Sequence, residues 1–146
     1  MFRRARALLG SAADAQEVVQ DVFVSFYENP DQFAGRSALT TFLYGATTHA
    51  CLNRLRNQKT RQRLLDQHVG EGIGEGSGAR SSEELLMLHR ALRSMPEELA
   101  QVAVYYCVDG LRHEEIARLL ACSRRHVGNL LARVSTWAQA QEDEAC

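Results

Sequence analysis

The stretch HEEIARLLACSRRHVGNLL, residues 113–131, constrains the fold of this chain more than any other. It holds two short helical patterns, at residues 114–120 and 124–131, on either side of a three-residue break. Its apolar residues have the spacing of two crossing helices with a shared core, and they are Ile116, Leu120, Cys122, Val127 and Leu130. Small residues stand at the helix crossing (Ala117) and in the turn (Ala121), where Gly is common. The spacing predicts a helix-turn-helix whose second helix enters the DNA major groove. The alternative is an ordinary helical hairpin within an all-α core.

Helical periodicity also dominates the first part of the chain. A short basic helix is expected to end at Gly10, and a second helix with apolar residues three and four apart follows from Ser11 to the stop at Pro30. A long helical pattern then extends from Ser37 into the basic residues 54–63. No alternating run of β-branched residues lies between turn residues, so we predict no strands.

The composition changes in the middle of the chain. Residues 68–82, HVGEGIGEGSGARSS, contain five glycines without periodicity, which is typical of a flexible linker. Ser81 and Glu84 form a capping box that begins the next helix. Pro96 is expected at the first position of a further helix, which ends near Gly110.

These patterns predict an all-α protein of two small helical domains joined by a flexible linker, with the helix-turn-helix in the C-terminal domain. The predicted parts are a first domain at residues 1–66, a linker at 67–82, a second domain at 83–140 and an acidic tail at 141–146, which we expect to fray.

The formal net charge of −1 conceals an uneven distribution. Residues 1–66 hold nine Arg and Lys against six Asp and Glu, and residues 85–137 hold seven against five, whereas the linker and tail are acidic. A local basic excess fits contact with a polyanion. Residues 1–4, MFRR, lack the apolar core of a signal peptide, no apolar run has membrane-spanning length, and the four cysteines include no CxxC pair. We therefore expect a cytoplasmic protein without membrane insertion.

The motifs of enzymes and metal sites are missing from the sequence. There is no Gly-rich phosphate loop, nucleophile elbow or paired-carboxylate site. His113, Cys122 and His126 could begin a metal site, but a fourth ligand at a recognisable spacing is lacking and Cys122 fills an apolar position. We predict no catalytic residues, no metal and no cofactor.

Three stretches in order resemble the extracytoplasmic-function (ECF) sigma factors of bacterial RNA polymerase, the sigma-70 family members with only two conserved domains. DAQEVVQDVFVSFYENPDQFAG (residues 14–35) resembles the helix that docks on core polymerase. ALTTFLYGATTHACLNRLR (38–56) resembles the segment that melts and reads the minus-ten promoter element. MPEELAQVAVYYCVDGLRHEEIARLLACSRRHVGNLLARV (95–134) resembles the domain that reads the minus-thirty-five element. The resemblance implies a sigma factor that directs transcription initiation, with core RNA polymerase, promoter DNA and, in many members, an anti-sigma protein as partners.

On the first of these helices, a polar and acidic stripe lies beside the apolar face. Its residues are Asp14, Glu17, Gln20 and Asp21. Such a stripe can pair with a basic partner helix, and the resemblance implies that Gln20 and Asp21 lie at the polymerase contact. The alternative is a solvated helix face.

The second stretch interleaves aromatic, basic and amide residues, which suits unstacked bases and a phosphate backbone. The candidate minus-ten residues are Phe42, Tyr44, His49, Asn53, Arg54 and Arg56. For the aromatic residues, packing in the core is the alternative to base contact.

The third stretch offers its candidates at the start of the second helix of the helix-turn-helix. The exposed DNA-binding candidates there are Arg124, Arg125, His126 and Asn129. Of these, Arg124, Arg125 and Asn129 are expected to face base edges, because Arg binds guanine and Asn binds adenine. Arg112 and Arg133 are better placed for phosphates. Where members of the resembled family often carry cations, this chain has Gly128 and Leu130, so we expect weak DNA affinity from this domain alone.

Two other functions stay open at this point. One is a stand-alone helix-turn-helix regulator that binds DNA without polymerase. The other is a degenerate sigma-like module that serves only protein interaction.

Overall fold

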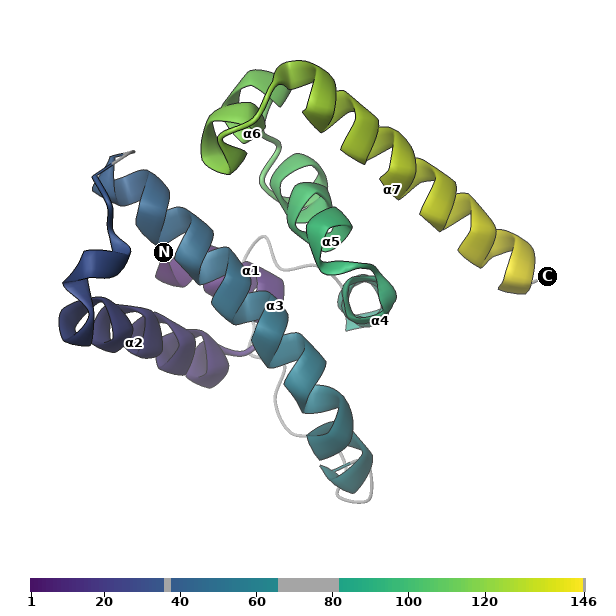
Figure 1. Cartoon of the computed structure of the whole chain (residues 1–146). Coiled ribbons are helices and arrows are strands. Elements are labelled where there is room, and N and C mark those ends of the chain that lie inside the picture. The colour runs from purple at the N-terminus through teal and green to yellow at the C-terminus, as the bar shows by residue number, and fades with distance from the viewer. Residues whose placement is uncertain (36–37, 66–81, 146) are drawn as a thin grey trace. The chain divides into compact units, whose positions relative to one another are not determined.

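The computed structural model describes residues 1–35, 38–65 and 82–145, and every regular element in these ranges is a helix or a helical turn, which confirms the all-α prediction. The elements, drawn in Figure 1, are α1 (Phe2–Leu9), α2 (Ala12–Glu28), the 3-10 turn η1 (Pro30–Gln32), α3 (Leu39–Leu65), α4 (Ser82–Ser94), α5 (Glu97–Ala103), the π-helical turn η2 (Val104–Val108), α6 (His113–Leu120) and α7 (Arg124–Ala145). They form two compact units, Met1–Arg93 and Ser94–Cys146. Most of the predicted linker, including Ser81, lies outside the described residues.

The first unit is built on three helices, with α1 packed against α2 and α3 and α2 packed against α3. Its buried apolar residues are Ala5, Leu8, Leu9, Ala15, Val18, Val22, Cys51, Leu52, Leu55 and Leu92. Two buried threonines sit in α3, and their hydroxyls donate to backbone carbonyls one turn earlier: Thr47 to Leu43 at 2.7 Å and Thr48 to Tyr44 at 3.0 Å. These internal bonds satisfy the hydroxyls within the apolar core.

Gly10 ends α1 in the left-handed conformation, with φ of 72°, and its N–H donates to the Arg6 carbonyl at 2.8 Å. A Cβ added at this position would lie 2.2 Å from Cδ2 of Leu85 in α4. The left-handed backbone conformation favours glycine, and a larger residue would also have to displace the Leu85 side chain.

Helix α4 belongs to the first unit by its contacts. The buried His89 ring bonds through Nε2 to the Leu8 carbonyl of α1 at 2.7 Å. Arg93 Nε donates to the Leu55 carbonyl of α3 at 2.9 Å. The sequence pattern assigns this helix to the second domain, and the domain limits that we predict from it remain a prediction.

The second unit contains α5, η2, α6 and α7, with α7 packed against both α5 and α6. Its buried apolar residues are Met95, Leu99, Ala100, Val102, Ala103, Val104, Tyr105, Ile116, Ala117, Val127 and Leu130. Of the apolar positions of the predicted helix-turn-helix, Ile116, Val127 and Leu130 are buried in this core. Leu120 and Cys122 are half-buried.

Two helix predictions in this unit need correction. The continuous helix expected from Pro96 to Gly110 changes to a π-helical turn at Val104, where the Asp109 N–H reaches back five residues to the Val104 carbonyl at 3.0 Å. The acidic end, expected to fray, continues α7 to Ala145 (yellow end of the chain in Figure 1).

Candidate functional site

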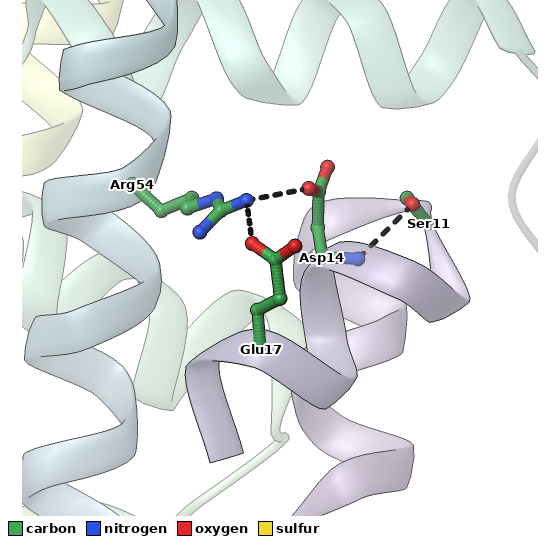
Figure 2. Close-up of polar contacts among 4 residues, drawn as sticks. All are labelled: Ser11, Asp14, Glu17 and Arg54. Carbon is green, nitrogen blue, oxygen red and sulfur yellow. Dashed lines mark hydrogen bonds and ion pairs between the residues drawn. The ribbon is translucent and has the colours of Figure 1, made fainter. Parts of the chain in front are cut away.

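The acidic stripe of α2 begins at the start of the helix. Ser11 is the N-cap, and its side-chain oxygen accepts a hydrogen bond from the Asp14 N–H at 3.3 Å. This cap fixes the first turn, so that the carboxylates of Asp14 and Glu17 project from the same face of α2 toward α3 (Figure 2).

Arg54 of α3 occupies the space between these two carboxylates (Figure 2). Its Nη2 atom donates to Asp14 Oδ1 at 2.9 Å and also to Glu17 Oε2. The hydrogen bond that Arg54 donates to Glu17 is the largest contribution that raises the pKa of Arg54, and the Asp14 carboxylate adds to it. A residue expected at promoter DNA is therefore paired with two residues expected at polymerase.

Gln20 and Asp21, one turn further along α2, are exposed. Three large apolar side chains beside them are also exposed: Phe23, Val24 and Tyr27, the last with 86% of its surface accessible. Because Gln20, Phe23, Val24 and Tyr27 are spaced by three, four and seven residues, they share one face of the helix. We call these four residues together with Asp21 the α2 surface.

The sequence reasoning missed the apolar part of the α2 surface. The run from Val18 to Tyr27 is apolar on more than one side of the helix, so the spacing alone does not separate the buried stripe from the exposed one. A signal for this exposed apolar patch is present in the sequence. The helix carries more apolar residues than one stripe holds, and a helix in a small domain needs only one buried stripe.

The aromatic residues expected at the minus-ten element pack within the first unit. The Phe42 ring lies 6.0 Å from the ring of Phe26 and 5.6 Å from that of Phe33, measured between centroids. The Arg4 guanidinium sits 3.8 Å from the centroid of the Tyr44 ring. Of the two interpretations left open for these side chains, the observed contacts are those of packing.

The remaining minus-ten candidates divide between two faces of α3. His49 and Asn53 are exposed and Arg56 is half-buried, and their spacing of four and three residues puts them on one face. Arg54, one residue after Asn53, lies about 100° around the helix and reaches α2 instead.

The turn of the helix-turn-helix is a helix C-terminal motif centred on Ala121. Its backbone is left-handed, with φ of 52°. The Cys122 N–H donates to the Ala117 carbonyl at 3.0 Å and the Ala121 N–H donates to the Arg118 carbonyl at 3.4 Å. This pair of bonds defines a Schellman motif. Ala121 thus holds a conformation that glycine adopts more readily.

Helix α7 begins directly after this turn at Arg124, and the hydroxyl oxygen of the preceding Ser123 accepts a bond from the His126 N–H at 3.1 Å. Arg124, Arg125 and Asn129 are exposed on its first turns. Arg124 Nη1 lies 3.3 Å from Glu114 Oε1, whereas Arg125 makes no ion pair among the described residues. Basic side chains at the positive end of a helix suit an anionic partner.

Carboxylates from α5 and α6 accompany the other basic residues of this surface. Glu98 lies 3.8 Å from His126 Nε2 and 3.4 Å from Arg133 Nη1. Arg112 Nε lies 4.0 Å from Glu115 Oε1. Most of the predicted cations of the helix-turn-helix are therefore next to an intramolecular carboxylate, which lowers the positive potential of the surface.

The part of the chain that the structure describes contains no group of three His, Cys, Asp or Glu side chains that could hold a metal ion. Burial raises the pKa of the Cys122 thiol. In the same part of the chain, no helix has both the length and the apolar content needed to span a membrane.

Comparison with known proteins gives two family matches in order along the chain. Residues 1–61 match the family Sigma-70 region 2, and residues 85–135 match the family Sigma-70, region 4. The ECF RNA polymerase sigma-E factor of Escherichia coli K12 is 33% identical over 135 residues, which cover 84% of this chain and 69% of the relative. The protein of the same name from Haemophilus influenzae is 27% identical over 136 residues, 85% of this chain and 70% of the relative.

A solved structure agrees in fold. The sigma factor RpoE, in its co-crystal structure with the anti-sigma factor NepR from Bartonella quintana, matches with a TM-score of 0.53 at 16% identity, over 92% of this chain and 84% of that chain. The helical folds and the family matches define a two-domain transcription factor with a C-terminal helix-turn-helix. The chain belongs to the ECF sigma factors of the sigma-70 family. It is thus a regulatory protein that directs promoter recognition by RNA polymerase, as we predict from the sequence.

Proposed function

We propose that the α2 surface docks this sigma factor on core RNA polymerase. The exposed apolar side chains of Phe23, Val24 and Tyr27 share a helix face with Gln20, and Asp21 lies at the edge of this face. An apolar centre with a polar rim is the usual composition of a specific protein interface. Asp14 and Glu17, which the sequence also places at this contact as a prediction, lie outside the α2 surface in this proposal, because both are paired with Arg54.

The promoter contacts are proposed on two further helices. His49, Asn53 and Arg56 on one face of α3 suit the separated strands of the minus-ten element, since they combine a stacking ring, an amide and a cation. Arg124, Arg125, His126 and Asn129 at the start of α7 suit base edges in the major groove, and Arg112 and Arg133 suit phosphates.

One observation carries the proposal: a helix-turn-helix with an exposed basic start of α7 follows, in the same chain, a unit that matches Sigma-70 region 2. A stand-alone DNA-binding regulator has no need of the first unit. A degenerate interaction module has no need of the exposed Arg124, Arg125 and Asn129. Neither alternative is favoured.

The remaining properties follow from this function. We infer a cytoplasmic protein without catalytic activity of its own, because transcription takes place in the cytoplasm and the bond-forming chemistry belongs to polymerase. An anti-sigma protein is a further proposed partner, since the RpoE neighbour was crystallised with one.

The test is run-off transcription with purified core polymerase over a genomic DNA library, with sequencing of the start sites. We expect start sites that share an upstream motif and require this protein. A Gln20→Ala, Asp21→Arg double variant is expected to lose co-purification with core polymerase while it keeps its helical circular dichroism. Normal co-purification of the folded double variant would remove the α2 surface from the contact, and the absence of any specific start site would remove the proposed function.

A further inference from the structure

The ion pairs between Arg54 and the carboxylates of Asp14 and Glu17 connect two helices with different proposed partners. Arg54 lies 40 residues from Asp14 and 37 from Glu17 along the sequence, so the contact is a tertiary link between α2 and α3. It lies one turn before the α2 surface, because Gln20 and Asp21 follow Glu17 by three and four residues.

The position of Arg54 on α3 separates it from the proposed minus-ten residues. His49, Asn53 and Arg56 share one face, and Arg54 leaves α3 about 100° away from Asn53. Its guanidinium is mostly covered, with 21% of the side chain accessible. Both carboxylates bind the same Nη2 atom, and their negative charges disfavour a DNA phosphate beside Arg54.

The contribution of these ion pairs to the stability of the fold is small, because partly exposed pairs contribute little. Their geometry is nonetheless specific, since two carboxylates from successive turns of α2 converge on one Nη2 atom (Figure 2). A network of this kind fixes an orientation better than a single pair, because the shared partner limits the freedom of all three side chains.

We propose that Arg54 is a positioning residue: through Asp14 and Glu17 it holds α3 at a fixed orientation to α2, so that polymerase bound on α2 presents the minus-ten face of α3 to the promoter. This inference rests on the proposed function of the two helices. It replaces the prediction that Arg54 contacts DNA itself.

The two roles of Arg54 predict effects of opposite sign when the carboxylates are neutralised. If Arg54 positions α3, Asp14→Asn with Glu17→Gln removes the same link as Arg54→Gln, and both variants lose promoter opening. If Arg54 binds phosphate, the carboxylates compete with DNA for it, and their neutralisation strengthens promoter binding.

The experiment uses the full chain with core polymerase and a promoter fragment recovered in the run-off experiment. Four variants are compared: Arg54→Gln, the double variant Asp14→Asn with Glu17→Gln, the triple variant that combines them, and a control with Glu28→Gln and Asp31→Asn. The control makes the same change in charge at exposed residues near the other end of α2. Open complexes are measured by permanganate reactivity of unpaired thymines at saturating sigma factor, core affinity by fluorescence titration, and stability by thermal unfolding.

We expect Arg54→Gln and the double variant each to lower open-complex formation about three- to tenfold, the range that coupling within an ion-pair network produces. The triple variant should be no worse than either, because a single link is lost in all three. These variants should keep the core affinity and the unfolding temperature of the wild-type protein, and the control variant should match the wild-type protein in all three measurements. A purely structural role of the ion pairs would instead lower the unfolding temperature.

Two results would overturn the inference. More open complex with the double variant than with its control, together with less open complex with Arg54→Gln, would assign Arg54 to a DNA phosphate instead. A parallel fall of the unfolding temperature and core affinity would make the ion pairs a support of the fold only. Failure of the wild-type protein to bind core polymerase or to give transcripts is a separate outcome, and it would reject the proposed function itself.

Discussion

Glu98 of α5 and Arg133 of α7 form an ion pair on the exposed side of the second unit, with 3.4 Å between Oε2 and Nη1. The same carboxylate lies 3.8 Å from His126 Nε2 at the start of α7. Both residues are predicted DNA contacts, and Glu98 competes with the phosphate backbone for the Arg133 guanidinium. Such ion pairs offer a physical reason for the weak DNA affinity that we expect of this domain, because the carboxylate partly neutralises the cation that DNA would bind.

Glu98→Gln should therefore strengthen binding of a minus-thirty-five duplex about two- to fivefold, the equivalent of one exposed ion pair. Fluorescence anisotropy at several salt concentrations measures this affinity. Glu142→Gln removes the same charge from the acidic end of α7 and should have a smaller effect. If Arg133 is the released cation, the gain should vanish when Arg133→Ala is present in both proteins, and a gain that persists would point to His126 instead.

A second prediction concerns Gly128 of α7, which lies one turn after Arg124 and Arg125 and directly before Asn129. A Cβ at this position would meet no heavy atom within 4 Å. Gly128→Ala should raise the free energy of unfolding by about 1 kcal/mol, because glycine disfavours a helix interior. Gly128→Lys should stabilise the helix similarly and also strengthen duplex binding, with a salt slope steeper by about one. Equal duplex affinity of the Ala and Lys variants would show that position 128 does not face DNA.

Local signals account for the parts of the fold that could be predicted from the sequence. Gly10 and Pro30 each stop a helix through their own backbone chemistry, and the spacing around Ala121 sets the helix-turn-helix. Leu130 is a clear case, because its apolar position in the pattern corresponds to a side chain that is only 2% exposed.

Tertiary contacts account for what could not be predicted. The pairing of Arg54 with Asp14 joins residues 40 positions apart, and no periodicity within α2 or α3 identifies the partner. The attachment of α4 to the first unit depends on hydrogen bonds to the backbone carbonyls of Leu8 and Leu55. Because every residue has a backbone carbonyl, the sequence does not identify these partners either. The sequence therefore predicted the helices that carry the candidate residues but not which of their charges pair with each other, and the roles of these residues stay predictions.

A third prediction tests the turn of the helix-turn-helix. Ala121 has a φ of 52°, where the Cβ of an L-residue is disfavoured. Ala121→Gly should raise the free energy of unfolding by about 1 kcal/mol, because glycine adopts this conformation without that cost. Denaturant unfolding followed by circular dichroism measures the change. Ala132→Gly, at an exposed position inside α7, should lower the stability by a similar amount. Loss of stability in both variants would contradict the left-handed conformation at position 121.

The last prediction concerns His89, whose Nε2 bonds to the Leu8 carbonyl at 2.7 Å. Burial lowers the pKa of His89 and the nearby Arg93 lowers it further, although the bond to the Leu8 carbonyl acts in the opposite direction. The unfolded chain, with a histidine pKa of about 6.5, then binds more protons than the folded chain as the pH falls below that value. The stability contributed by neutral His89 is therefore present above about pH 6.5 and is lost toward lower pH.

Thermal unfolding between pH 5 and 8 should show a smaller loss of stability below about pH 6.5 for His89→Gln than for the wild-type protein. His49→Gln, at an exposed position, is the control, and an unchanged pH dependence in His89→Gln would show that His89 does not cause it.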